Sequence, residues 1–292
     1  MIPHSKIFLL MVFFSGTIFS QVYSDSDVTV CKSKFAYAVS ADLTEESIND
    51  IVADVGKTFL GTPYVAHTLE DKGEEQLVIN LTGLDCTTFV ENTLVFARLI
   101  KMGKTTFRDY ENELQKIRYR KGVIDKYPSR LHYFSDWIYD NEKKGIIDDV
   151  TELVGGKPTR FHLNFMSTHP ESYPQLREHP EFIKEIRNQE AEINRRNYFY
   201  VPKERVGFVE NQINNGDIIA FTTSIPGLDI SHVGIAVRME DNRIHLLHAP
   251  NVGYKVQITE DPLAAYINKI KKDTGIIVLK PMDPTQADLT DY

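Results

Sequence analysis

The hydrophobic pattern of this 292-residue chain changes its period at Gly216. Before this glycine, apolar residues recur at the spacing of amphipathic helices. After it, short runs of branched residues are separated by turn signals, which is typical of β-strands. These runs are GDIIAF, HVGIAVR, RIHLLHA, YKVQI and GIIVLK, all between residues 216 and 280. Because short links favour antiparallel pairing, we expect an α+β protein with N-terminal helices packed on a C-terminal antiparallel sheet of about five or six strands.

Two segments of the first part carry the clearest helical patterns. Residues 43–60 have a continuous apolar face, and Asp42 or Thr44 could cap this helix. Residues 86–101 have a second such face, and Gly103 is a typical helix end. Further helices are expected at 106–118, 131–144, 180–197 and 261–270.

The first 20 residues have the layout of a secretory signal peptide, with Lys6, a short apolar run and small polar residues up to Ser20. The apolar run is shorter than the roughly 20 residues of a membrane span; an uncleaved anchor is the alternative. Cleavage after Ser20 would leave residues 21–292 as one domain, periplasmic or otherwise exported, with no membrane span. Loss of Lys6 would take the formal net charge from −8 to −9. Such an acidic chain is a poor partner for nucleic acid, whose phosphates need a basic face.

Cys86, one of only two cysteines, stands at the start of a predicted helix. If Asp85 caps this helix, the sulfur lies near the positive end of the helix dipole, which favours a thiolate and lowers a thiol pKa. A Thr88-x-x-Glu91 capping box is the alternative and would leave Cys86 just outside the helix. The position alone leaves open a nucleophile, a buried core thiol, or a disulfide with Cys31.

A cysteine nucleophile needs a base, normally a histidine held by a third polar group. Among nine histidines, His232, His245 and His248 lie on adjacent predicted strands. If the turn centres on Glu240, His232 lies opposite His248 on one face, with Cβ atoms about 5 Å apart, and His245 points to the other face. A one-residue slip would reverse this. These residues suggest a triad of Cys86, His232 and His248; a zinc site is the alternative, without the usual ligand spacing.

The motifs resemble those of the NlpC-type cell-wall peptidases, a bacterial branch of the papain-like cysteine hydrolases. The matching elements are GTPY at 61–64, Asp85-Cys86, Gly216-Asp217, HVGIAV at 232–237 and His248-Ala249. The resemblance implies a papain-like fold and thioester chemistry, with Cys86 as nucleophile, His232 as base and His248 as orienting residue. It implies no cofactor and no metal. It also places Tyr64 in the active site, bound to the oxyanion or the substrate; an ordinary half-buried tyrosine is the alternative.

The chain departs from this family in the long separation of Cys86 and His232, which leaves room for an insertion at 103–205. The core of the single catalytic domain would then be 43–101 and 206–282. The insertion, expected to be large and mostly helical, resembles a branch of the family associated with N-acetylmuramoyl-L-alanine amidase activity. We expect it to wall the substrate cleft.

The resemblance implies a peptidoglycan hydrolase, an N-acetylmuramoyl-L-alanine amidase that acts on muropeptides. We expect the protein to be a monomer. The same triad would serve a γ-D-glutamyl stem-peptide endopeptidase, and a non-catalytic cell-wall binding protein is a third alternative. An acidic protein needs local positive charge to bind an acidic muropeptide, which favours an arginine contact. Four side chains of the insertion could contact sugar or carboxylate groups, or could pack between helices: Arg130, Asp136, Trp137 and Arg160.

Overall fold

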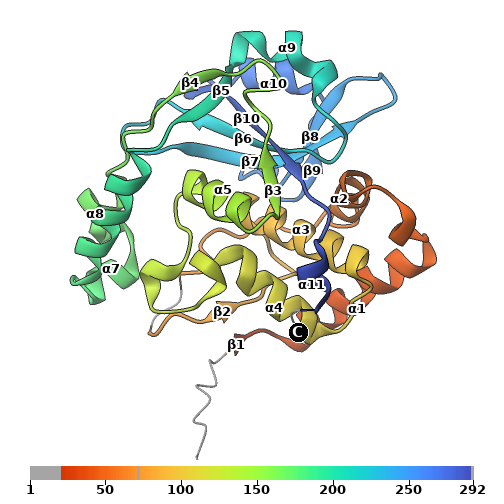
Figure 1. Ribbon diagram of the computed structural model, residues 1–292, viewed down its shortest axis with the longest axis horizontal. Coiled ribbons are helices and arrows are strands. Elements are labelled where there is room, and N and C mark those ends of the chain that lie inside the picture. Colours follow the sequence, from red (N-terminus) through yellow and green to blue (C-terminus); the bar gives the residue numbers. More distant parts are fainter. Residues whose placement is uncertain (1–20, 71–72, 291–292) are drawn as a thin grey trace, which may run out of the picture.

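The computed structural model of the protein describes residues 21–70 and 73–290. The predicted signal peptide, residues 1–20, lies outside the described residues. In the described part, no helix combines the length and the apolar character that crossing a membrane requires. Within these described residues, eleven α-helices and a large antiparallel sheet make up the fold (Figure 1). The predicted α+β class is therefore confirmed.

The segments after Gly216 form five strands of the sheet, as predicted. They are β6 (Ile218–Thr223), β7 (Ile230–Arg238), β8 (Ile244–His248), β9 (Gln257–Ile258) and β10 (Asp273–Pro281). All neighbours pair antiparallel, in the order β10-β6-β7-β8-β9. The strand that carries His232, β7, is thus an inner strand, and both of its edges are hydrogen-bonded to a neighbouring strand.

The sheet is larger than predicted, with eight strands rather than about five or six. The additional strands come from the insertion, which is therefore not purely helical: β3 (Ile147–Asp149), β4 (Lys157–Thr159) and β5 (Tyr198–Pro202). β3 and β5 pair with β10, and β4 extends the sheet from β5. These strands are too short for a period-2 pattern, and two contain proline. β3 and β5 form because the long strand β10 offers an edge to pair with, and β4 forms on β5. A separate parallel pair joins β1 (Gln21–Val22) to β2 (Leu77–Val78).

The helices include all the predicted ones and several others. In chain order they are α1 (Asp25–Ser40), α2 (Ile48–Lys57), α3 (Cys86–Met102), α4 (Phe107–Arg118), α5 (Phe134–Lys143), α6 (Phe165–Thr168), α7 (Pro174–Glu178), α8 (Phe182–Ile193), α9 (Val206–Val209), α10 (Leu263–Asn268) and α11 (Gln286–Thr290). Short 3-10 turns lie at Leu43–Glu45, Arg120–Gly122, Tyr127–Ser129, Pro170–Ser172, Lys203–Arg205 and Glu210–Gln212.

Two details of the helices differ from the sequence expectation. Ser47, rather than Asp42 or Thr44, caps α2, because its hydroxyl accepts the backbone N–H of Asp50 at 3.2 Å. Helix α1, which the apolar pattern does not indicate, buries Cys31 completely. Both Cys31 and Cys86 are free thiols. The possible disulfide between them is therefore absent.

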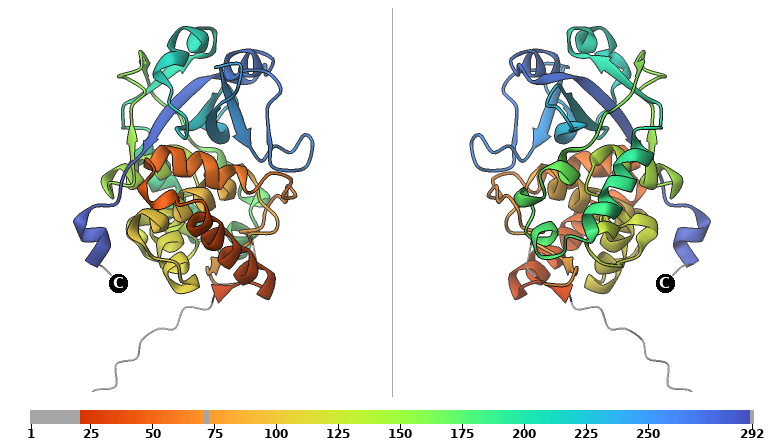
Figure 2. Two further views of the ribbon diagram at one scale, coloured as in Figure 1. Left: turned by 90° about the vertical axis from the view of Figure 1, so that its right-hand side faces the viewer. Right: turned by 90° about the vertical axis from the view of Figure 1, so that its left-hand side faces the viewer.

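Helices cover both faces of the main sheet (Figures 1 and 2). Val233, Ile235 and Val237 of β7 belong to the core cluster shared with α2 and α3. Ala236 belongs to a second cluster, on the face covered by α9 and α10. The alternation along β7 follows from the pleat of a strand. It separates the three residues that pack on α2 and α3 from Ala236, which packs on the opposite face.

The Gly216-Asp217 pair docks helix α2 against the sheet. Gly216 has φ +83°, and a Cβ atom there would stand 1.8 Å from the carbonyl oxygen of Asn49. The buried carboxylate of Asp217 accepts hydrogen bonds from Asn49 Nδ2 at 2.8 Å and from the Asn214 backbone at 2.7 Å. Glycine is the residue that tolerates such a conformation and such an approach. The motif is a packing device that holds the helical half of the molecule on the sheet.

Candidate active site

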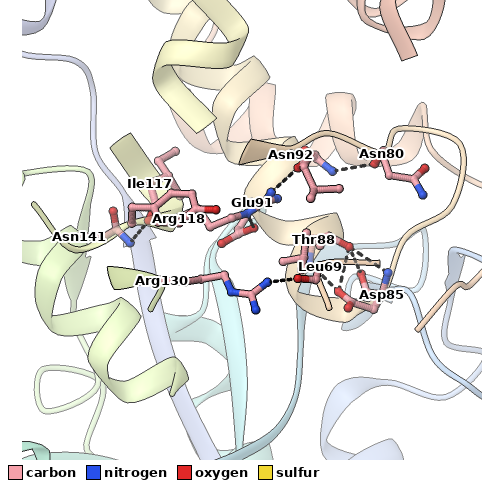
Figure 3. A network of polar contacts seen from close by, with 12 residues as sticks. Leu69, Asn80, Asp85, Thr88, Glu91, Asn92, Ile117, Arg118, Arg130 and Asn141 are labelled. Carbon is pink, nitrogen blue, oxygen red and sulfur yellow. Dashed lines mark hydrogen bonds and ion pairs between the residues drawn. The ribbon is translucent and has the colours of Figure 1, made fainter. Parts of the chain in front are cut away.

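Cys86 is the first residue of α3, and Asp85 is its N-cap. The Asp85 carboxylate accepts the backbone N–H of Thr88 at 2.8 Å, and Thr88 Oγ1 accepts the backbone N–H of Asp85 at 2.9 Å (Figure 3). This reciprocal pair fixes the first helical turn. Asp85 is thus the cap, and the alternative Thr88–Glu91 box is wrong, because Glu91 forms a buried ion pair with Arg118 at 2.8 Å.

The thiol of Cys86 is partly buried, next to the backbone N–H of Val233 and to Thr87. Burial and, next, the charge of Asp85 raise the pKa of this thiol, whereas hydrogen bonds from Val233 and Thr87 lower it, and together they bring it to about 11. The expectation that the helix start depresses the thiol pKa is therefore wrong in this environment: burial outweighs the amides. A neutral thiol of this kind needs a base to become a nucleophile.

A pair of histidines lies on the strands next to Cys86. Nε2 of His232 is 2.7 Å from Nδ1 of His248, and the two rings are nearly perpendicular, at 79°. Burial lowers the pKa of His232 to about 4, with the charge of Lys272 acting in the same direction. Burial also lowers the pKa of His248. Both rings are therefore neutral at pH 7, and Nδ1 is the nitrogen of His232 that remains for a further partner.

The contact between the two histidines forms although the predicted strand register differs from the observed one. β7 and β8 pair Ile235 with Leu247, a shift of two residues from the pairing that puts His232 opposite His248. In the observed register Gly234 faces His248, and the two imidazoles meet along a diagonal. A shift of two keeps each side chain on its face, whereas a shift of one would not.

The third histidine of these strands points away from the pair, as predicted. His245 lies 2.8 Å from the Thr259 carbonyl oxygen through Nδ1 and 3.0 Å from Asp241 through Nε2. His248 has different surroundings. Its Nε2 atom is buried and has no hydrogen-bond partner among the described residues, and its ring meets that of Tyr266 edge to face, with centroids 5.4 Å apart.

Cys86 and His232 line one cleft of about 240 Å³. Its walls come from the start of α3, from the chain between β6 and β7, and from the insertion, which forms a wall as expected. The lining residues are Glu70, Cys86, Thr87, Leu131, His132, Tyr133, Phe134, Met166, Tyr173, Leu228, Asp229, Ile230, Ser231, His232 and Val233. The two charged residues in this lining, Glu70 and Asp229, are acidic.

The sequence alone does not single out these two acids. Glu70 forms an ion pair with Arg130 at 2.7 Å. The buried carboxylate of Asp229 accepts the backbone N–H groups of Ser135 and Ile230, each at 2.7 Å. Asp229 thereby ties the first turn of α5 to the start of β7. Its place directly before the histidine strand is the one signal that could have indicated this role.

His132, also in the cleft wall, is held by the backbone. Its Nε2 lies 2.9 Å from the carbonyl oxygen of Tyr127, so Nε2 carries the proton and Nδ1 is an acceptor. Burial lowers the pKa of His132 well below its usual range, and the charge of Arg130 adds to this. The ring is therefore a neutral part of the wall.

Tyr64 lies beside the cysteine segment. It forms an isolated parallel bridge with Leu84, and its backbone N–H donates to the Tyr254 carbonyl oxygen at 2.8 Å. Burial raises the pKa of the Tyr64 hydroxyl, and charges on Cys86 and Asp85 raise it further. The phenol is thus half-buried and close enough to the thiol to respond to its charge.

Three of the four candidate insertion residues are buried in ion pairs or packing. Arg130 pairs with Glu70 and Glu75, and donates to the Leu69 carbonyl oxygen (Figure 3). Asp136 pairs with two arginines, and Trp137 is fully buried. Their position supports packing rather than substrate contact.

Arg160, the fourth candidate, is exposed and lines a separate cavity.

No candidate metal site occurs within residues 21–70 and 73–290, because no group of three or more His, Cys, Asp or Glu side chains there is arranged to hold a metal ion.

Comparison with known proteins identifies relatives along most of the chain. Residues 54–276 match the family model AmiA-like, described as N-acetylmuramoyl-L-alanine amidase-like. A crystal structure of an N-acetylmuramoyl-L-alanine amidase from Bacteroides uniformis is 39% identical, with a TM-score of 0.77, over 81% of this chain and 99% of that one. A putative xylanase from Bacteroides fragilis is 41% identical, with a TM-score of 0.73, over 77% and 98%.

A Legionella pneumophila protein with the family model DUF1460 shares the fold at 20% identity, with a TM-score of 0.67, over 89% of this chain and 97% of that one. No curated protein matches. The family match spans more than three quarters of the sequence, and it includes Cys86, His232 and His248. The chain therefore belongs to the N-acetylmuramoyl-L-alanine amidase-like (AmiA-like) family.

Proposed function

We propose that the protein is a cysteine amidase that cleaves the bond between the lactyl group of N-acetylmuramic acid and the L-alanine of a stem peptide. One observation carries this proposal: His232, which is hydrogen-bonded to His248, lines the same cleft as a cysteine at a helix start. The family and the Bacteroides uniformis amidase support the choice of bond. The arrangement of helix-borne cysteine and strand-borne histidines also supports a papain-like, NlpC-type relationship.

The proton positions follow from the geometry of the pair. His232 can take the Cys86 proton on Nδ1 only if its own proton is on Nε2, which then donates to Nδ1 of His248 at 2.7 Å. In this arrangement His248 carries its proton on Nε2, which is buried and has no hydrogen-bond partner among the described residues. His248 is thus the orienting residue and selects the reactive tautomer of His232.

The reaction then runs in two acyl-transfer steps. The thiolate of Cys86 attacks the lactyl carbonyl carbon, and the proton moves to His232. Backbone N–H groups at the start of α3, with the Tyr64 hydroxyl, stabilise the oxyanion. His232 protonates the alanine nitrogen as the C–N bond breaks, which leaves a thioester. Water, deprotonated by His232, attacks the thioester and releases the lactyl carboxylic acid and the thiol.

The predicted signal peptide supports export, and we propose that residues 21–292 act as a single, monomeric catalytic domain on peptidoglycan fragments in the periplasm. The test is mass spectrometry of muropeptides after digestion. We expect free peptides that begin with L-alanine, together with intact N-acetylmuramic acid. A cut after D-glutamate would instead identify a stem-peptide endopeptidase, and binding without turnover would identify a wall-binding protein.

The name of the Bacteroides fragilis relative raises glycoside hydrolysis as an alternative. That chemistry needs two carboxyl groups free to act as acid and as base or nucleophile. Glu70 and Asp229 line the cleft, but Arg130 pairs with one and backbone amides bind the other. The geometry favours the thiol chemistry, and we expect no sugar release from xylan in the same digestion assay.

The raised thiol pKa predicts how the reactivity of Cys86 depends on pH. With a thiol pKa of about 11 and a His232 pKa of about 4, the resting pair is neutral between these values. The thiolate fraction then rises about tenfold for each pH unit. We expect the alkylation rate of Cys86 by iodoacetamide, followed by peptide mapping, to rise accordingly from pH 6 to 9. A rate that is already constant at pH 6 would mean a preformed thiolate–imidazolium pair and contradict this prediction.

A further inference from the structure

The charge of the cleft does not match the charge of the proposed substrate. Stem peptides carry carboxylates on D-glutamate and at the C-terminus, whereas the charged residues that line the Cys86 cleft are Glu70 and Asp229. Arg130 is close, but it is buried and neutralised by Glu70 and Glu75. A carboxylate of the substrate therefore needs a cation outside this cleft.

A second cavity adjoins the cleft and contains such a cation. It has a volume of about 320 Å³ and shares Leu228 with the Cys86 cleft. Its lining includes Arg160, Thr222, Thr223, Ser224 and Thr274, and it has no acidic residue. The hydroxyl groups of Thr223 and Ser224 donate to the Lys272 carbonyl oxygen, so the hydroxyl donors in question are those of Thr222 and Thr274. Arginine with neighbouring hydroxyl donors is a typical environment for a carboxylate.

Among the described residues, the guanidinium group of Arg160 forms a hydrogen bond through Nε only. Its Nε donates to Asn197 Oδ1 at 3.3 Å, and no other hydrogen bond or ion pair to Arg160 occurs within the described ranges. The two terminal nitrogens of the guanidinium group can therefore form a bidentate contact. Thr222 and Thr274 share one hydrogen bond between their hydroxyl groups at 2.7 Å, so one of these two hydroxyls retains a hydrogen for a ligand.

The wall between the two cavities is fixed. Gly227 has φ +81°, and a Cβ there would stand 2.4 Å from Oδ1 of Asn164. The Gly227 carbonyl oxygen accepts the backbone N–H groups of Asn164 and Phe165 at 3.3 and 3.2 Å. These contacts join the segment after Arg160 to the segment before His232. They therefore fix the position of one cavity relative to the other.

We propose that the Arg160 cavity is a carboxylate-binding subsite, which holds an acidic group of the stem peptide while its alanine amide lies at Cys86. This inference rests on the proposed function for the identity of the substrate. The neutral bond to be cleaved lies in the cleft that has no positively charged lining residue, and the charged part of the same molecule lies at Arg160. The subsite contributes to binding rather than to the chemical step.

The test compares Arg160→Met with Arg187→Met, which removes an exposed arginine of the same insertion that is not part of the cavity. The substrates are an N-acetylmuramoyl tripeptide with all carboxylates free, the same compound amidated at the D-glutamate α-carboxylate, and one amidated at the C-terminus. For the free compound we expect Arg160→Met to raise KM on the order of tenfold with little change in kcat. Arg187→Met should leave both constants unchanged.

The amidated compounds identify which carboxylate is bound. The effect of Arg160→Met should disappear for the compound that lacks the bound carboxylate and persist for the other. Equal KM values for Arg160→Met and Arg187→Met with all three substrates would overturn the subsite. So would an unchanged effect with both amidated compounds.

A calorimetric arm separates this proposal from the proposed function. The same compounds are titrated into protein with Cys86→Ala, with and without Arg160→Met, so that no hydrolysis is needed. If the wild type does not cleave the lactyl–alanine bond but carboxylate-dependent binding still requires Arg160, the subsite stands and the proposed reaction fails. If the wild type cleaves the lactyl–alanine bond but binding does not depend on Arg160, the proposed reaction stands and the subsite fails.

Discussion

Replacement of Cys86 by alanine is expected to reduce hydrolysis of muropeptides by at least about 10⁴-fold, because it removes the nucleophile of the proposed thioester pathway. The folded structure should persist. Asp85 and Thr88 form the helix cap between themselves, and the partly exposed sulfur of Cys86 is not essential to the core. The measurements are kcat by chromatography of released peptide, and the melting temperature of the same preparation.

The second cysteine is a matched control for this variant. Cys31 is fully buried in α1, and burial raises the pKa of its thiol to about 12. Cys31→Ala should lower the free energy of unfolding by about 1–2 kcal/mol through the cavity it leaves and should keep kcat within about twofold. A Cys86→Ala protein with wild-type kcat would exclude the cysteine mechanism. Loss of activity in both variants would point to a structural cause.

The parity of side chains on strands made the histidine pair predictable from the sequence. His232 and His248 share a face under any register that differs by two residues, so the argument tolerated an error of two in the pairing of β7 with β8. The helix cap at Asp85 was also predictable, because an acidic residue directly before an apolar helix is a local signal. Local rules thus predicted the elements that carry the site.

What the sequence did not reveal depends on tertiary contacts. Strands β3 and β5 exist because one edge of β10 is free to pair, and β4 exists because it pairs with β5. No local pattern encodes these contacts. On the basis of charge alone, Arg130 is a reasonable substrate ligand. In the structure it forms ion pairs with Glu70 and Glu75, which lie 55 or more residues earlier in the chain. The pKa of Cys86 has a similar origin, because burial and the charge of Asp85 raise it by more than the hydrogen bonds from Val233 and Thr87 lower it.

Substitutions of His248 should separate an orienting role from simple packing. In His248→Asn, the side-chain oxygen can occupy the place of Nδ1 and accept the proton of His232 Nε2, so the reactive tautomer is retained. In His248→Gln, the amide reaches the position of Nε2 instead and leaves His232 without its partner at 2.7 Å. We expect a kcat loss of about tenfold for the asparagine variant and of roughly 10³-fold for the glutamine variant, by analogy with loss of the tautomer-setting group in other triads.

The order of these two activities is the decisive result. Both variants remove the same imidazole and its edge-to-face contact with Tyr266, so a packing role would give similar losses in both, matched by similar falls in melting temperature. An orienting role predicts an unequal loss of kcat at similar stability, with KM little changed, because the hydrogen bond acts on His232 and not on the substrate. Greater activity in His248→Gln than in His248→Asn would contradict the proton arrangement derived from the Nε2–Nδ1 contact.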